Sequence, residues 1–302
     1  MNLESAVPML GGVEAGGTKL VCLVGSGPTA VVATTRIEVA DPVGTLAAAV
    51  RFFREQADGG NRPAAIGVGS FGPLELRRGH PRYGQITTTP KPGWSGTDMV
   101  APFAALGVPV GFDTDVNAAA MAEGRWGAAR GLASFIYLTV GTGIGGGAVV
   151  DGRLLRGLGH PEMGHVPVPR RPGDTFAGVC PFHGDCLEGM ASGPAAAARF
   201  GRRAELLDGD ERAAATGILA WYLAAGVGSL VDALAPERVV IGGGLGSMPG
   251  LVAATGAALV VRLAGYPGLP EHADPGFVVP AELGAMAGPL GTLILAERAA
   301  AI

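Results

Sequence analysis

Short apolar segments alternate with helical patterns along most of the chain. Apolar runs of three to five residues predict buried strands at 10–13, 20–24, 65–68, 108–112, 135–139, 147–150, 238–241 and 277–279. Apolar residues at helical spacing, or runs of good helix formers, predict helices at 42–56, 118–129, 196–203, 212–234, 249–263 and 286–301. Because strands and helices alternate, the pattern predicts an α/β protein.

Two long segments lack this periodicity. Residues 81–96 are rich in Gly, Pro and Thr, and residues 161–194 contain many Pro, Gly, His and Cys residues. Loops of this length in compact domains are usually functional or mobile. We therefore look for chemistry in these two segments.

Composition narrows the class of protein. A chain of 302 residues with 48% hydrophobic and 16% charged residues can bury the core of one large domain or two medium ones. The net charge of −4, without a cluster of Lys and Arg, argues against a nucleic-acid partner. Three cysteines argue against a secreted disulfide framework. No signal-peptide pattern and no uncharged apolar stretch of about 20 residues is visible, so we predict a cytoplasmic protein without a membrane partner.

Three glycine-rich turns follow predicted strands, at residues 14–19, 141–147 and 242–246. Glycine lets backbone amides approach a phosphate without a clash from a Cβ atom, and successive amides can form an anion-binding nest. Each turn taken alone also fits a tight β-turn without a ligand. The P-loop pattern G-x-x-x-x-G-K-[ST] is absent from the sequence.

Asp115 is a candidate catalytic base because it lies just after a predicted strand, at the start of a helix. A carboxylate there could accept a proton from a substrate hydroxyl. It could equally cap the helix, as could Asp113, Thr114 or Asn117. Position alone leaves both interpretations open.

Four residues form a candidate metal site: His165, Cys180, His183 and Cys186. The spacing of the last three can wrap a tetrahedral zinc ion, and His165 is the natural fourth ligand. Four protein ligands would close the site, which favours a structural zinc over a catalytic one. The alternative is a pair of free thiols with incidental histidines.

The glycine turns resemble the nucleotide-binding segments of the ROK sugar kinases. Residues 14–19 (E-A-G-G-T-K) resemble their first phosphate loop, residues 139–147 their second, and residues 241–245 their adenosine-contacting turn. The order and wide spacing match over nearly the whole chain, although most of the family has Asp where this chain has Glu14. The resemblance implies contacts with ATP and Mg²⁺ from Glu14, Gly16, Gly17, Thr18, Lys19, Thr139, Gly141, Thr142, Gly143, Gly145, Gly242, Gly243 and Gly244.

The remaining motifs extend the resemblance to the sugar site. Residues 113–119 (D-T-D-V-N-A-A) resemble the ROK segment E-N-D-x-N-A-A, whose second acid is the base; this implies Asp115 as base and Asn117 as a residue that positions sugar or loop. The E-x-G-H and C-L-E motifs imply sugar contacts from Glu162 and Glu188. His160 could touch sugar or could be a surface histidine.

The zinc motif points to one branch of the family. ROK kinases carry a zinc motif at this place, and the variant here, C-P-F-H-G-D-C at residues 180–186, looks like the fructokinase branch. Residues 69–74 and 88–94 also resemble fructokinases, and Lys91 and Trp94 could line the cleft. A zinc ion there would hold Glu162 and Glu188 in place.

The resemblance implies a two-domain actin-like ATPase (ribonuclease H-like) fold with an interdomain cleft. The small domain would span residues 1–117, with a C-terminal helix at about 289–302 packed back on it, and the large domain residues 118–288 with the zinc loop. We expect a homodimer, by analogy, that uses ATP·Mg to convert D-fructose into fructose 6-phosphate. Glucokinase and mannokinase remain alternatives. A further alternative is a sugar-responsive repressor, which is disfavoured because the dozen residues before Glu14 contain no helix-turn-helix pattern. The last alternative is a non-catalytic sugar-binding protein.

Overall fold

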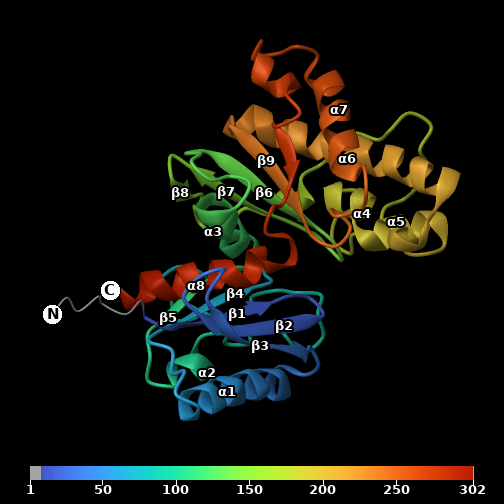
Figure 1. Cartoon of the computed structure of the whole chain (residues 1–302). Coiled ribbons are helices and arrows are strands. Elements are labelled where there is room, and N and C mark those ends of the chain that lie inside the picture. Colours follow the sequence, from blue (N-terminus) through green and yellow to red (C-terminus); the bar gives the residue numbers. More distant parts are fainter. Residues whose placement is uncertain (1–7, 302) are drawn as a thin grey trace. The chain divides into compact units, whose positions relative to one another are not determined.

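The computed structural model describes residues 8–301, which pack into two compact units (Figure 1). Unit 1 contains the described residues up to Ala122, the short segment Arg156–His160 and the chain from Met286 onward. Unit 2 contains Glu123–Leu155 and Pro161–Ala285. These units are defined by packing alone, and the domain limits at 117 and 288 stay a prediction.

Unit 1 is built on a five-stranded mixed sheet. From one edge to the other its strands are β3 (Val31–Glu38), β2 (Lys19–Gly25), β1 (Leu10–Ala15), β4 (Ile66–Ser70) and β5 (Val110–Thr114). The three N-terminal strands form an antiparallel meander, and β4 and β5 run parallel to β1. The sheet therefore ends in β5 beside the start of α3 (Asp115–Trp126).

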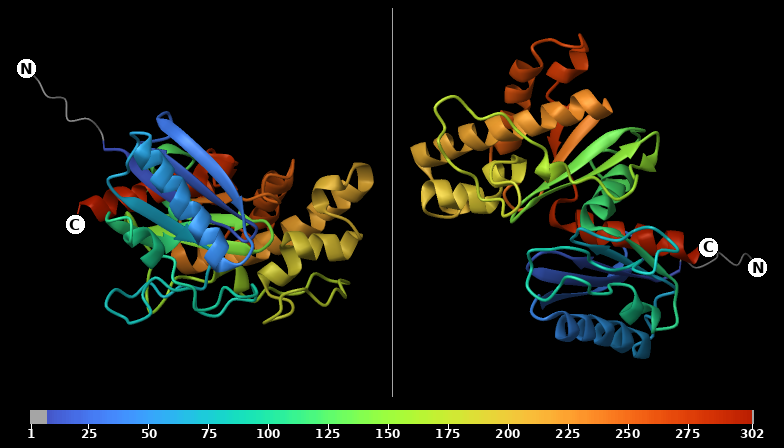
Figure 2. Two further views of the ribbon diagram at one scale, coloured as in Figure 1. Left: turned by 90° about the horizontal axis from the view of Figure 1, so that it is seen from below. Right: turned by 180° about the vertical axis from the view of Figure 1, so that it is seen from behind.

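Two helices cover opposite faces of this sheet (Figure 2). The amphipathic helix α1 (Pro42–Asp58) buries Leu46, Phe52 and Phe53, and Asp41 caps it by accepting a hydrogen bond from Gly44 N at 2.8 Å. The other face carries α8 (Ala287–Ala300), most of whose residues are buried. The short helix α2 (Ala101–Ala104) precedes β5.

Glycines let α8 lie against the sheet backbone. A Cβ atom added at Gly67 in β4 would lie 1.8 Å from the carbonyl oxygen of Thr292, and one at Gly111 in β5 would lie 2.2 Å from that of Leu295. Backbone atoms cannot move aside as the end of a flexible side chain can. Only glycine therefore fits at these two positions of the sheet.

Unit 2 repeats the strand order and strand directions of unit 1. Its strands are β8 (Arg153–Leu154), β7 (Ile144–Val150), β6 (Phe135–Val140), β9 (Arg238–Gly242) and β10 (Val278–Pro280). β7 is antiparallel to β6 and β8, whereas β9 and β10 run parallel to β6. The shared order confirms the predicted two-part, ribonuclease H-like α/β fold.

Helices of unit 2 pack around its sheet and the loop before α4. They are α4 (Leu187–Ala191), α5 (Gly193–Phe200), α6 (Gly209–Leu234) and α7 (Leu251–Leu263). Short 3₁₀ turns are η1 (Met163–His165), η2 (Ala204–Leu206), η3 (Pro270–Ala273) and η4 (Gly284–Met286). The C-terminal end of α3, from Glu123, also belongs to unit 2.

Four expectations about elements need correction. Strand β3 was not predicted, because its core-facing positions are partly polar or small and alternate with exposed ones. Strand β7 begins at Ile144, so the second glycine turn is limited to 141–143 and Gly145 lies in a strand. Helix α3 begins at Asp115 rather than at 118. Helices α4 and α5 begin inside the segment predicted to lack periodicity.

Helix α6 is long and apolar. By length and composition α6 could cross a membrane, and it is the only such helix among residues 8–301. Of its most apolar 18-residue window, however, 67% is buried inside the protein. Such burial is what a core helix of a globular unit shows.

We predict that Gly67→Ala lowers the free energy of unfolding by about 3 kcal/mol, because the new methyl group meets the carbonyl of Thr292. Gly217→Ala is the matched control: this exposed position in α6 has no neighbour within 4 Å of an added Cβ, and the change should stabilise by about 0.5–1 kcal/mol. Thermal unfolding measures both. A Gly67→Ala protein as stable as the wild type would contradict the close approach of α8.

Candidate active site and metal centre

The candidate base stands at the first residue of α3, directly after β5. The hydroxyl of Thr114 accepts a hydrogen bond from Asn117 N at 3.1 Å, so Thr114 provides the cap considered for Asp115. The described hydrogen bonds of the Asp115 carboxylate come from nearby backbone, with Val116 N donating to Oδ1 at 2.9 Å. Asp115 itself is half-buried.

Two carboxylates of unit 1 influence each other. Burial raises the pKa of Asp115 to about 6, opposed by backbone hydrogen bonds. The pKa of Glu14 is raised to about 7, first by burial and then by the charge of Asp115, against the opposing effect of Lys19. Gly288 at the start of α8 makes room for Glu14, since a Cβ there would lie 2.0 Å from Glu14 Oε1. Asp115 is therefore mostly ionised at neutral pH, whereas Glu14 is close to half-protonated.

Asn117 belongs to a buried polar network that sequence reasoning did not find. Its Nδ2 donates to Asp113 Oδ1 at 2.7 Å, and Arg156, 43 residues away in sequence, forms an ion pair with Asp113 Oδ2. Asn117 Oδ1 is buried and has no hydrogen-bond partner among the described residues. A buried acceptor without a donor is unusual, so Asn117 Oδ1 is a candidate acceptor for a ligand hydroxyl. No local motif could have pointed to Arg156.

The second and third glycine turns lie side by side in unit 2. They end the neighbouring parallel strands β6 and β9, in which Thr139 pairs with Gly242. Gly246 N donates to Val140 O at 2.9 Å. Gly243 has φ of +86°, and a Cβ there would lie 2.5 Å from Val140 O. The two turns thus form one surface of exposed backbone amides around Thr142 and Gly244, of the kind that can hold phosphate.

The first glycine turn, at residues 14–19, connects β1 to β2 in unit 1. Gly16 N donates to Lys19 O at 2.9 Å, which closes the turn. Gly17 and Thr18 at its tip are exposed, so their backbone and the Thr18 hydroxyl are accessible to a ligand.

The other three predicted sugar contacts have different surroundings. Glu188 in α4 accepts a hydrogen bond from Ile144 N at 2.9 Å, which joins it to the second glycine turn. Glu162 is exposed and precedes η1. His160 is half-buried in unit 1, and its Nε2 accepts a hydrogen bond from Leu74 N at 2.9 Å, so it is not an isolated surface histidine.

The four predicted metal ligands converge in unit 2. Their ligand atoms all lie within 4.8 Å of one another. Cys180 Sγ lies 3.6 Å from His165 Nδ1 and 3.7 Å from His183 Nδ1, and Cys186 Sγ lies 3.5 Å from His165 Nδ1. A tetrahedral zinc ion with its usual bond lengths separates sulfur from nitrogen by about 3.6 Å. The donor set and its spacing therefore fit such an ion.

Burial, with a smaller contribution from the neighbouring Cys180, raises the pKa of the Cys186 thiol to about 11. Both cysteines are free and buried. Thiolates at this site would thus need a nearby positive charge, which a bound divalent metal supplies.

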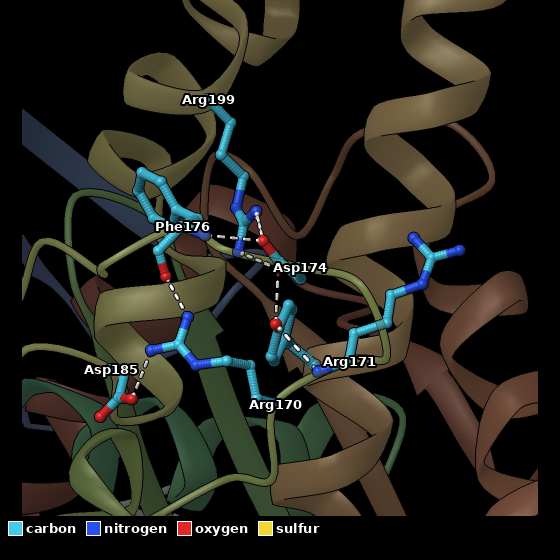
Figure 3. A network of polar contacts seen from close by, with 7 residues as sticks. Arg170, Arg171, Asp174, Phe176, Asp185 and Arg199 are labelled. Atoms are coloured by element: carbon cyan, nitrogen blue, oxygen red, sulfur yellow. Dashed lines mark hydrogen bonds and ion pairs between the residues drawn. The ribbon is translucent and has the colours of Figure 1, made fainter.

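A network of polar contacts anchors the loop that carries these ligands (Figure 3). Asp174 in the loop is paired with Arg199 of α5 at 2.8 Å and accepts a hydrogen bond from Tyr222 Oη of α6 at 2.5 Å. The Arg199 guanidinium stacks 4.1 Å from the ring centroid of Phe176. The hydrogen bond that Arg199 donates to Asp174 holds the pKa of this carboxyl well below its usual range. The loop is therefore attached to two helices without the metal.

Comparison with known proteins assigns the class. The profile of the ROK family matches residues 10–299, so the chain belongs to the ROK family. A fructokinase of Zymomonas mobilis is 44% identical over 247 residues, which cover 80% of this chain and 82% of that protein.

Solved structures agree with this assignment. A ROK hexokinase from Thermus thermophilus is 31% identical, covers 96% of this chain and 98% of its own, and has a TM-score of 0.76. A ROK family glucokinase from Streptomyces griseus, in complex with glucose and AMPPNP, is 25% identical with a TM-score of 0.73 over 96% of this chain and 99% of that one.

We predict that Arg199→Met lowers the free energy of unfolding by about 3 kcal/mol, because it removes the ion-pair partner of the mostly buried Asp174 carboxylate. Arg203→Met is the control: its pair with Glu205 is exposed, so we expect a loss below about 0.5 kcal/mol. The Arg199 contribution should shrink as pH falls below the ordinary Asp pKa of about 4, since protonation removes the charge. Equal losses in both variants, measured by urea unfolding, would refute the anchoring role.

Proposed function

We propose that this protein transfers the γ-phosphate of ATP to D-fructose and forms fructose 6-phosphate. The observation that carries the proposal is its 44% identity to the Zymomonas mobilis fructokinase over most of both chains. The candidate site supplies the chemistry that a sugar kinase needs: an ionised carboxylate, backbone amides arranged for phosphate and a buried acceptor for a hydroxyl.

Asp115 is the proposed general base. It would accept the proton of the fructose 6-hydroxyl while that oxygen forms its bond to the γ-phosphorus and the bond from phosphorus to the ADP oxygen breaks. A pKa of about 6 suits this task, because the carboxylate is ionised at neutral pH yet basic enough to take a proton. Mg²⁺, when bound, neutralises phosphate charge, and Glu14 is the proposed residue that faces it.

The glycine turns are the proposed nucleotide contacts. The paired turns of unit 2 offer backbone amides from Gly141 to Gly143 and from Gly242 to Gly244, with the side chains of Thr139 and Thr142 beside them. The turn of unit 1 offers Thr18 and Lys19.

Asn117, Glu162, Glu188 and His160 are the proposed sugar contacts. The support is strongest for Asn117, whose Oδ1 lacks a donor within the described part of the chain. Asn117 lies two residues after Asp115, which the 6-hydroxyl of fructose must reach. The remaining hydroxyls of the sugar would be bound by carboxylates such as Glu188.

Zinc is the proposed occupant of the cluster formed by His165, Cys180, His183 and Cys186. Two sulfur and two nitrogen donors at tetrahedral spacing suit zinc better than the oxygen-preferring Mg²⁺. A structural ion would fix Cys186, which directly precedes the helix of Glu188.

A homodimer, found in the cytoplasm, is proposed by analogy with the family alone.

A coupled assay with fructose, mannose and glucose tests the substrate. Turnover on fructose above the other two is expected. Preference for glucose or mannose would reassign the protein to a glucokinase or mannokinase. No turnover on any hexose would favour a non-catalytic sugar-binding protein and refute the kinase.

We predict that Asp115→Asn lowers kcat by about 10²–10⁴-fold, while binding of fructose persists, because the amide keeps the shape and cannot accept the proton. Asp151→Asn, in the exposed turn after β7, is the control and should leave kcat unchanged. In the wild type, kcat/KM should fall about tenfold per pH unit below pH 6, as Asp115 gains its proton. Full activity in Asp115→Asn would exclude the residue as base.

We predict about one equivalent of zinc per chain after dialysis, measured by elemental analysis. Cys180→Ser should lose most of this metal because the hydroxyl is a poor zinc ligand, whereas Cys22→Ser, outside the cluster, should retain it. A metal-free wild type that is folded and active would refute the structural role.

A further inference from the structure

Lys91 lies in a position that the proposed mechanism does not yet use. The chain has only two lysines, Lys19 and Lys91, and both are at the first glycine turn. Lys19 belongs to the turn itself. Lys91 reaches it from 74 residues away in the sequence, and its ammonium donates a hydrogen bond to the carbonyl oxygen of Gly17.

Two aromatic rings hold the Lys91 ammonium. It lies 5.0 Å from the ring centroid of Phe71 and 5.4 Å from that of Trp94, and the two rings contact each other edge to face at 5.4 Å. Both faces attract a cation through their quadrupoles. The ammonium is therefore fixed by groups that carry no negative charge.

The aromatic cage is itself firmly anchored. Phe71 follows β4, and its N–H donates to Ala15 O of β1 at 2.8 Å. Trp94 is fully buried, and its Nε1 donates to Ala40 O at 3.1 Å. Prolines on both sides of Lys91 restrict the backbone of this loop. The position of the ammonium thus depends on the strands of unit 1 as well as on its own restricted loop.

The charge of Lys91 is not compensated within the described part of the protein. No carboxylate there forms an ion pair with it, and burial lowers its pKa without an acidic neighbour to oppose the effect. Half-buried cations without a partner are unfavourable, and proteins usually pair them. With one N–H bound to Gly17, the ammonium retains two donors for an anion.

We propose that Lys91 is a phosphate-binding catalytic residue, which contacts the phosphoryl group that passes from nucleotide to sugar. This inference rests on the proposed function. Its support is the contact with the exposed turn at Gly17 and the aromatic cage without a carboxylate. An ammonium is a compact point charge, so it can stay in contact with the phosphoryl oxygens while they move during transfer.

The test is Lys91→Met, which keeps the length and apolar contacts of the side chain and removes its charge. We expect kcat/KM for ATP to fall at least 100-fold. Calorimetry should show at least tenfold weaker binding of AMP-PNP or of fructose 6-phosphate, which carry that phosphoryl group on the donor side and the product side. Binding of fructose and of ADP, which lack it, should change less than twofold.

Two comparisons keep the outcome unambiguous. Arg51→Met removes an exposed cation of α1 in the same unit and should leave every binding constant unchanged. Loss of fructose and ADP binding together with AMP-PNP binding would show that Lys91 only supports the fold, and no loss in any arm would equally overturn the proposal. A wild type that turns over no hexose would refute the proposed function instead, and AMP-PNP binding would still decide the role of Lys91.

Discussion

The geometry of unit 1 depends on the close approach of α8 to the sheet backbone. Gly67 allows a helix carbonyl to lie where any Cβ atom would be. In α8 itself, Gly288 makes room for the carboxylate of Glu14. Gly291 packs on the backbone of α3, since a Cβ there would lie 1.8 Å from a carbonyl oxygen of that helix. The helix that begins with Asp115 is thus positioned by the same packing that holds the sheet together.

Unit 2 uses the same constraint at the edges of its own site. Gly164 of the E-x-G-H motif packs on the carbonyl of Ile144, where a Cβ would lie 1.7 Å away, and Gly189, next to Glu188, packs similarly on Gly184 at 1.9 Å. These motif glycines are therefore packing residues. They set the backbone from which the proposed ligand contacts extend, and the polar network around Asp174 anchors the loop between them.

Several charged and polar groups of unit 1 are only partly compensated by their neighbours. Burial raises the pKa values of Glu14 and Asp115, and the charge of Asp115 raises that of Glu14 further. Lys91 holds a positive charge without a carboxylate partner in the described chain. Asn117 adds an acceptor without a donor. Each arrangement costs folding free energy in the free protein, and we propose that binding of a cation, a phosphate or a hydroxyl offsets this cost.

By itself, the sequence determined what is local in the chain. Apolar runs placed most strands and helices, glycine turns followed them, and the ligand spacing within residues 180–186 indicated a metal site, because side chains a few residues apart have little freedom to separate. Tertiary structure alone decided which distant groups meet. Arg156 contacts Asp113 across 43 positions of the sequence, and Lys91 contacts Gly17 across 74. Strand β3 could be recognised only from the burial of one of its faces. Such contacts follow from packing in three dimensions, which no short window of residues encodes.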